Sequence, residues 1–193
     1  PTKKRVVPLE HYFFLPDAYT EVGNEMIKIV DSKGNFQNYN HIKQHYEKYQ
    51  GHKVVNKLVA YLKEHNMAPA LFFVFSRKET ERLAKSIQRG LVTAEESAEI
   101  SKIFNYELRN YKKIYEKSSQ YIEIENLLLK GVVYHHSGLV PILKEVIEIL
   151  FEKGLVKLLF ATETFAVGVN APTKTVVFPK LTKYSNGGFR CLR

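Results

Sequence analysis

The chain has 193 residues, 45% of them hydrophobic, which is enough to bury one core and to form one domain, with room for an appendage. Its formal net charge of +9 favours polyanions, so nucleic acid is the leading partner class, although the charge alone is equally compatible with a role in solubility. A single cysteine, Cys191, excludes an internal disulfide and a multi-cysteine zinc site, and no apolar run approaches the roughly 20 residues that span a bilayer.

The N-terminal part of the sequence predicts one strand followed by a linker. The residues Pro8–Leu15 are rich in aromatic side chains and are bounded by prolines, which is typical of a strand. The residues Asp31–Gly51 are polar and show no apolar period, which predicts a loop. We therefore expect an N-terminal strand and polar linker over residues 1–50, and a larger domain over residues 51–193.

Helical and strand patterns alternate through the rest of the chain. Apolar residues at helical spacing predict helices over His52–His65, Arg77–Gly90, Thr93–Tyr111, Tyr115–Leu129 and Pro141–Lys153, with a short helix from Glu163. Short apolar runs predict buried strands over Ala70–Phe75, Gly131–His135, Val156–Ala161 and Thr175–Phe178. Because parallel strands need crossovers and helices supply them, the fold class is α/β, with a mostly parallel sheet flanked by helices.

Ligands of such sheets bind beyond the carboxyl ends of the strands, and Ser76 and Arg77 follow the first buried strand there. A hydroxyl and cations beside free helix amides suit a phosphate. The same residues also fit an ordinary N-cap, in which Ser76 pairs with Glu79 three residues later as a capping box. Both interpretations can hold at once.

Two histidines, His135 and His136, follow the next strand. Adjacent side chains on a strand point in different directions, and no other ligand stands at metal spacing, so we do not expect a zinc site. Ser137 and Gly138 precede a helix that begins with proline, and we expect free amides there that suit a sugar or phosphate. Simple helix initiation explains the same residues.

The third segment, Thr162–Pro172, joins a buried strand to a short helical turn. It concentrates hydroxyls and a carboxylate at a strand end, and Gly168 and Asn170 let the backbone approach a ligand closely. As a pattern, Thr-Glu-Thr is only a helix start, so physical reasoning alone leaves the function open.

Residues 132–178 and the later "KYSNGGFR" resemble the second RecA-like domain of the DExH-box RNA helicases of the exosome and superkiller type, members of superfamily 2. "ALFFVFSRKETERLA" is similar to helicase motif IV, and "ATETFAVGVN" is similar to motif V. The resemblance covers the chain from the first strand to Arg193. It implies a RecA-like sheet with helices on both faces, and a motor domain that unwinds RNA for processing or decay.

Carried over residue by residue, the resemblance implies two sets of contacts. The residues expected to contact the RNA backbone are Ser76, Arg77, His135, His136, Gly138, Thr162, Glu163 and Thr164. Gly168 and Asn170 are expected to face ATP in the cleft between two domains. Backbone contacts of this type predict little sequence preference and a marked dependence on salt.

The sequence also departs from a complete helicase. It has no phosphate loop of the Gly-x-x-x-x-Gly-Lys type, and neither Asp17 nor Asp31 is followed by Glu, so the DExH box is absent. The chain also stops at Arg193, before the arginine-rich motif VI of the family. We therefore expect a fragment without catalytic residues of its own, with ATP and Mg²⁺ bound mainly by a first RecA-like domain that is absent here.

The expected partners are RNA, that first RecA-like domain, and an RNA-decay complex, with no membrane, in an intracellular and soluble protein. Two alternatives stay open at this point. One is a stand-alone nucleic-acid-binding module that lacks catalysis, and the other is a domain of a related DNA helicase.

Overall fold

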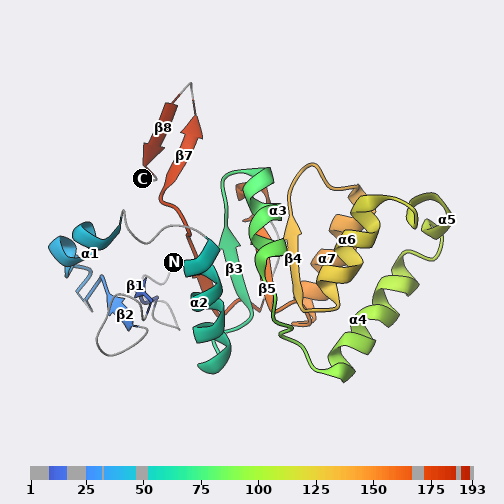
Figure 1. Ribbon diagram of the computed structural model, residues 1–193, viewed down its shortest axis with the longest axis horizontal. Helices are drawn as coiled ribbons and strands as arrows, with labels where there is room; N and C mark the ends of the chain where they lie inside the picture. Colours follow the sequence, from blue (N-terminus) through green and yellow to red (C-terminus); the bar gives the residue numbers. More distant parts are fainter. Residues whose placement is uncertain are drawn as a thin grey trace, which may run out of the picture. The chain divides into compact units, whose positions relative to one another are not determined.

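The computed structural model describes residues 9–16, 25–31, 33–46, 52–166, 172–185 and 188–191 (Figure 1). The chain divides into two compact units, Pro1–Tyr61 and Leu62–Arg193. The helix α2, His52–Glu64, crosses the boundary between them and confirms the helix predicted over that segment.

The first unit contains an antiparallel pair of strands, β1 (Tyr12–Leu15) and β2 (Glu25–Lys28). Leu15 and Ile27 are buried between them, and this small core confirms the aromatic-rich strand that the sequence predicted. The loop predicted over Asp31–Gly51 is wrong for Tyr39–Tyr46, which form helix α1. The sequence did not predict this helix because its residues are mostly polar, and a helix without a broad apolar stripe shows no apolar period in the sequence.

A parallel sheet of four strands organises the second unit (Figure 1). Its strands are, in spatial order, β4 (Val132–His135), β5 (Leu158–Ala161), β3 (Ala70–Phe73) and β6 (Thr175–Val177), and each neighbouring pair is parallel. Every residue of β4 and β5 is buried, as are the first three of β3, so the continuous apolar runs are those of strands covered on both faces.

Helices cover this sheet on both faces. The chain moves past β5 in going from β3 to β4, and it returns from β4 to β5, so right-handed crossovers place α3 (Arg77–Ser86) and α7 (Pro141–Glu152) on opposite faces. Figure 1 shows α3 in front of the strands. The arrangement is the RecA-like α/β fold that we expected.

Three helices separate α3 from β4, where the sequence predicted two. They are α4 (Ala94–Glu107), α5 (Lys112–Tyr115) and α6 (Ser119–Leu128). α4 begins with a complete capping box between Thr93 and Glu96, and it contacts both α6 and α7. α6 contacts β4. The remaining elements are a 3₁₀ turn, η2 (Glu163–Ala166), and a hairpin of β7 (Thr182–Ser185) and β8 (Gly188–Cys191) that the sequence did not predict.

The core lies between the sheet and its helices. The inner face of α7 is at most 1% exposed and consists of Leu143, Val146, Ile147, Leu150 and Phe151. Within the sheet, the rings of Phe72 on β3 and Phe160 on β5 lie 4.6 Å apart. Each fully buried side chain of this size stabilises the fold by about 1.5–3 kcal/mol through its removal from water. The strands whose ends carry the candidate residues are therefore held in a well-packed core.

Candidate functional site

The candidate residues gather at one edge of the sheet because the strands are parallel. β3 leads to Ser76, β4 ends at His135, and β5 leads to Thr162. Parallel strands place their carboxyl ends on the same side, so three segments that are far apart in the sequence lie at a common edge.

Ser76 caps helix α3, as the sequence predicted. Its side chain accepts a hydrogen bond from the amide of Glu79 at 3.4 Å, and its backbone is extended. The buried hydroxyl of Thr80 donates to the carbonyl oxygen of Ser76 at 2.6 Å, which fixes the turn from below. The carboxylate of Glu79 binds Arg82. The first turn of α3 is thus held in place with Ser76 and Arg77 exposed.

Arg77 and Gly138 come together at this edge although they lie on different loops. A Cβ atom added to Gly138 would lie 3.7 Å from Nη1 of Arg77. It would also lie 3.1 Å from the ring of His136, so the loop passes close over that ring. The contact joins the segment after β3 to the segment after β4, and it places a cation at this edge of the sheet.

His135 lies in the interior, on the side of the sheet that α7 covers. The residue is 6% exposed, its Nε2 atom lies 2.9 Å from Oε1 of Glu148, and its ring meets the ring of Phe165 edge-on at 4.9 Å. Burial lowers the pKa of His135, and the hydrogen bond with Glu148 opposes that shift only in part.

His136 points the other way, towards α3, so the two histidines diverge as we expected. Its Nδ1 atom accepts a hydrogen bond from the amide of Gly138 at 3.0 Å, which assigns the proton to Nε2, 3.1 Å from Oε1 of Glu81. The ring stacks on Tyr134 at 5.4 Å and is 3% exposed. Neither histidine side chain forms part of the exposed surface, and His136 supports the loop from within through its bond with the amide of Gly138.

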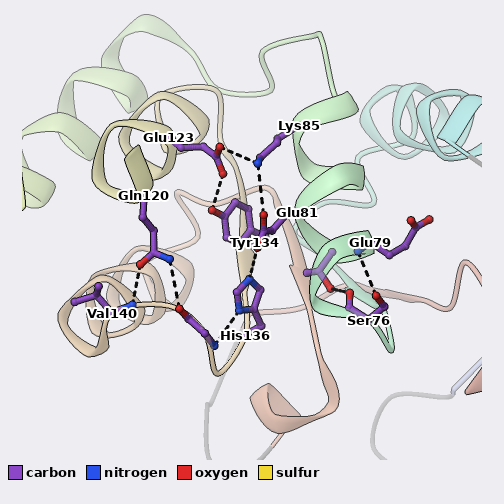
Figure 2. A network of polar contacts seen from close by, with 11 residues as sticks. Ser76, Glu79, Glu81, Lys85, Gln120, Glu123, Tyr134, His136 and Val140 are labelled. Atoms are coloured by element: carbon purple, nitrogen blue, oxygen red, sulfur yellow. Dashed lines mark hydrogen bonds and ion pairs between the residues drawn. The ribbon is translucent and has the colours of Figure 1, made fainter. Parts of the chain in front are cut away.

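A chain of polar contacts extends from His136 to α6 (Figure 2). Glu81 also binds Lys85, which binds Glu123 at 2.8 Å, and Glu123 accepts the hydroxyl proton of Tyr134 at 2.6 Å. Burial, followed by that hydrogen bond, raises the pKa of Tyr134, and Glu123 raises the pKa of Lys85. The network ties α3, β4 and α6 together and reaches the loop through His136.

The amides of the loop from His136 to Val140 are largely used within the protein. The amide of Gly138 donates to His136, that of Leu139 to the carbonyl of His136 at 3.1 Å, and that of Val140 to Oε1 of Gln120 at 2.9 Å. The expectation of a free amide at Gly138 is therefore wrong, because the adjacent imidazole takes it. Ser137 is exposed.

Sequence reasoning missed three residues that shape this site: Glu81, Gln120 and Glu123. Gln120 lies 18 and 20 residues from the loop positions that it binds, and Glu81 lies 55 residues from His136. No short motif joins positions at such distances, so only the packing of α3 and α6 on β4 reveals them.

The third segment begins at Thr162, which is partly buried. Its amide donates to the carbonyl oxygen of His135 at 3.2 Å, and its own carbonyl accepts from Phe165 at 3.1 Å. Glu163 begins the 3₁₀ turn, is exposed, and is followed by Thr164 within that turn. Gly168 and Asn170, expected to face ATP, lie outside the described residues. The RNA contacts expected of Thr162, Glu163 and Thr164 stay predictions.

In the part of the chain that the structure describes, no three His, Cys, Asp or Glu side chains come close enough together to hold a metal ion. None of the described helices is long and apolar enough to cross a membrane.

The chain is similar to curated proteins over almost its whole length. It is 35% identical to human "Superkiller complex protein 2" over 99% of this chain and 17% of that protein. It is 35% identical to the Arabidopsis thaliana "DExH-box ATP-dependent RNA helicase DExH9" over 99% of this chain and 21% of that protein. It is 35% identical to human "Exosome RNA helicase MTR4" over 98% of this chain and 19% of that protein. The chain thus spans about a fifth of the length of these relatives. No protein-family model matches it.

Proposed function

Since this chain belongs to the superkiller and exosome family of DExH-box RNA helicases, we propose that it forms the second motor domain of an ATP-dependent RNA helicase. In that role it binds the RNA backbone at the carboxyl edge of its sheet. Two of the proteins reported above are named as RNA helicases, and the RecA-like sheet is the fold that such a motor domain requires.

The observation that carries the proposal is the meeting of Arg77 with the loop at Gly138. The exposed residues Ser76, Arg77 and Ser137 lie at one edge of the sheet, and hydroxyl and guanidinium groups bind phosphate oxygens well. None of the described contacts selects a base, so recognition is of the backbone and depends little on sequence. The buried His136 acts by holding the loop in place through the amide of Gly138.

ATP and Mg²⁺ belong mainly to another domain in this proposal. The chain has no phosphate-loop sequence, and its described carboxylates do not form a metal-binding cluster, so its donor groups do not fit the Mg²⁺–triphosphate group by themselves. Gly168 and Asn170 are proposed to face the nucleotide from this side of the cleft. The partners are RNA, a first RecA-like domain, and an RNA-decay complex.

RNA binding by the 193-residue chain tests the proposal. Anisotropy of a labelled single-stranded RNA is measured from 50 to 200 mM salt for the wild type, for Arg77→Gln, and for a matched control, Arg89→Gln. Arg89 is also exposed, but it follows the C-terminal end of α3. Nearby, the amide of Leu91 donates to the carbonyl oxygen of Lys130, which precedes β4. Loss of one phosphate contact lowers the slope of log K against log salt by about 0.7–0.9, and Arg77→Gln is expected to show that change while the control does not.

Equal effects of Arg77→Gln and Arg89→Gln on RNA binding would show that only the net charge of the chain matters for affinity. That result would refute a binding site at the edge of the sheet. A DNA of the same sequence and length separates the RNA proposal from a DNA helicase domain. RNA-stimulated ATP turnover by this chain alone would contradict the proposed division of labour between two domains, because the groups that hold ATP would then lie in this chain.

A further inference from the structure

Helix α6 carries a side chain that spans the loop after β4. Gln120 accepts the amide proton of Val140 at 2.9 Å through Oε1, and its Nε2 atom donates to the carbonyl oxygen of Gly138 at 3.4 Å (Figure 2). A side-chain amide has an acceptor oxygen and two N–H donors, so it can bond both to a backbone amide and to a backbone carbonyl, as a neighbouring strand does. One residue thereby fixes both ends of the Gly138–Val140 segment.

The start of α7 has few means of its own to hold this shape. Helix α7 begins at Pro141, and Val140 is its N-cap residue. The side chain of Val140 makes no capping hydrogen bond, and Pro141 has no amide to donate. Gln120 accepts from the amide of the N-cap residue itself, which a Glu or Gln at the third helical position accepts in a capping box; Leu143 stands at that position here. The other side of the loop is held by His136, whose ring accepts the Gly138 amide and is oriented by Glu81 of α3.

The helix that carries Gln120 is firmly anchored. Ser118 caps it by accepting from the amide of Tyr121 at 3.2 Å, and Tyr121 packs edge-on against Phe104 of α4 at 5.0 Å. Glu123, one turn after Gln120, binds both Tyr134 and Lys85. The position of Gln120 is therefore set by the helices α4–α6 and by β4, and it does not depend on the loop.

We infer that Gln120 is a positioning residue: the helices α4–α6 hold the Gly138–Val140 loop through its side-chain amide, and so keep Gly138 beside Arg77 for contact with RNA. This inference rests on the proposed function only for the identity of the ligand. It gives the helices inserted between α3 and β4 a part in the site itself, beyond covering the sheet.

Hydrogen exchange and RNA binding together test the inference on the 193-residue chain. Gln120→Leu removes both hydrogen bonds at similar volume, Gln120→Glu keeps an acceptor for Val140, and Gln88→Leu is the control at an exposed position after α3. The amide of Val140 is expected to exchange about 2- to 10-fold faster in Gln120→Leu, because one net hydrogen bond is lost, and to recover in Gln120→Glu. RNA affinity is expected to fall by about 3- to 10-fold in Gln120→Leu and to stay at the wild-type level in the control.

A double-mutant cycle distinguishes positioning from general destabilisation. If Gln120 acts by placing the loop beside Arg77, the losses of affinity in Gln120→Leu and Arg77→Gln are non-additive, whereas independent effects add. Unchanged exchange at Val140 would overturn the inference whatever RNA does. Faster exchange with unchanged RNA affinity would also overturn it, because the loop position would then not matter for binding. Failure of the wild type to bind RNA would instead refute the proposed function, while exchange at Val140 would still decide whether Gln120 holds the loop.

Discussion

Three glycines offer a graded test of how tightly the second unit is packed around the start of β4. Gly131 adopts φ +76°, and a Cβ atom there would lie 2.5 Å from Cγ1 of Val92. Gly154 adopts φ +71° in open space, and Gly90 has neither a positive φ nor a neighbour within 4 Å. Alanine at the three positions therefore adds, in turn, strain with a clash, strain alone, and neither.

The magnitudes follow from these geometries. Left-handed backbone costs a non-glycine residue about 1–2 kcal/mol, so Gly154→Ala is expected to lower the free energy of unfolding by that amount. Overpacking adds about 1–3 kcal/mol, which gives about 2–5 kcal/mol for Gly131→Ala. Gly131 itself cannot move away from Val92 freely, because its carbonyl accepts from the amides of Lys157 at 2.7 Å and Leu158 at 3.0 Å. Gly90→Ala is expected to stay within about 0.5 kcal/mol of the wild type.

Urea unfolding followed by far-ultraviolet circular dichroism measures the three variants, with a constant m-value as the check that only stability has changed. A Gly131→Ala variant that is no less stable than Gly154→Ala would refute the close approach of Val92. A Gly90→Ala variant that loses as much as Gly154→Ala would refute the argument from backbone strain.

Three further predictions concern contacts around the site and at α4. Burial lowers the pKa of His135 in the folded state, so the unfolded state binds more protons once the pH falls below the ordinary histidine pKa near 6.5. The free energy of unfolding is therefore expected to be full at pH 8 and to decline through pH 6 towards the folded pKa. The urea midpoint of His135→Gln should decline less over the same range. Tyr134→Phe removes the donor to Glu123 and is expected to cost about 1–2 kcal/mol of unfolding free energy; a cost near zero would mean that the partly exposed Glu123 rehydrates without loss. Thr93→Ala removes one half of the capping box of α4 and is expected to cost about 1 kcal/mol, whereas Thr173→Ala, on a loop, should cost less than half of that.

The strands of the sheet were predictable because each is buried on both faces and reads as an unbroken apolar run. The run Ala70–Phe75 became β3 at Ala70–Phe73, and the run Val156–Ala161 became β5 at Leu158–Ala161, so only the ends differ. Helix α1 was missed for the opposite reason, since its sequence has no broad apolar stripe. Hydrophobic period therefore predicted the strands of the main sheet and missed helix α1.

The site was predictable only where it depends on local chemistry. Ser76 was expected as an N-cap, and the structure confirms it, because capping involves residues three apart. The occupied amide of Gly138 was not predicted, since it depends on which nitrogen of His136 faces the loop. That choice is set by Glu81, which only the packing of α3 against β4 brings near. Long-range pairing of this kind leaves no mark in a local pattern.

The internal use of the loop amides changes the kind of phosphate recognition that this edge can provide. A row of free amides would form a neutral nest whose phosphate binding varies little with salt. Because the loop amides are used within the protein, the charge of Arg77 is the main attraction for a phosphate, and the exposed hydroxyl of Ser137 is a neutral donor beside it. Binding through a cation releases counterions, so affinity is expected to fall steeply with salt. An edge of this kind is expected to bind any nucleic-acid backbone alike, which is the property that the proposed RNA motor requires.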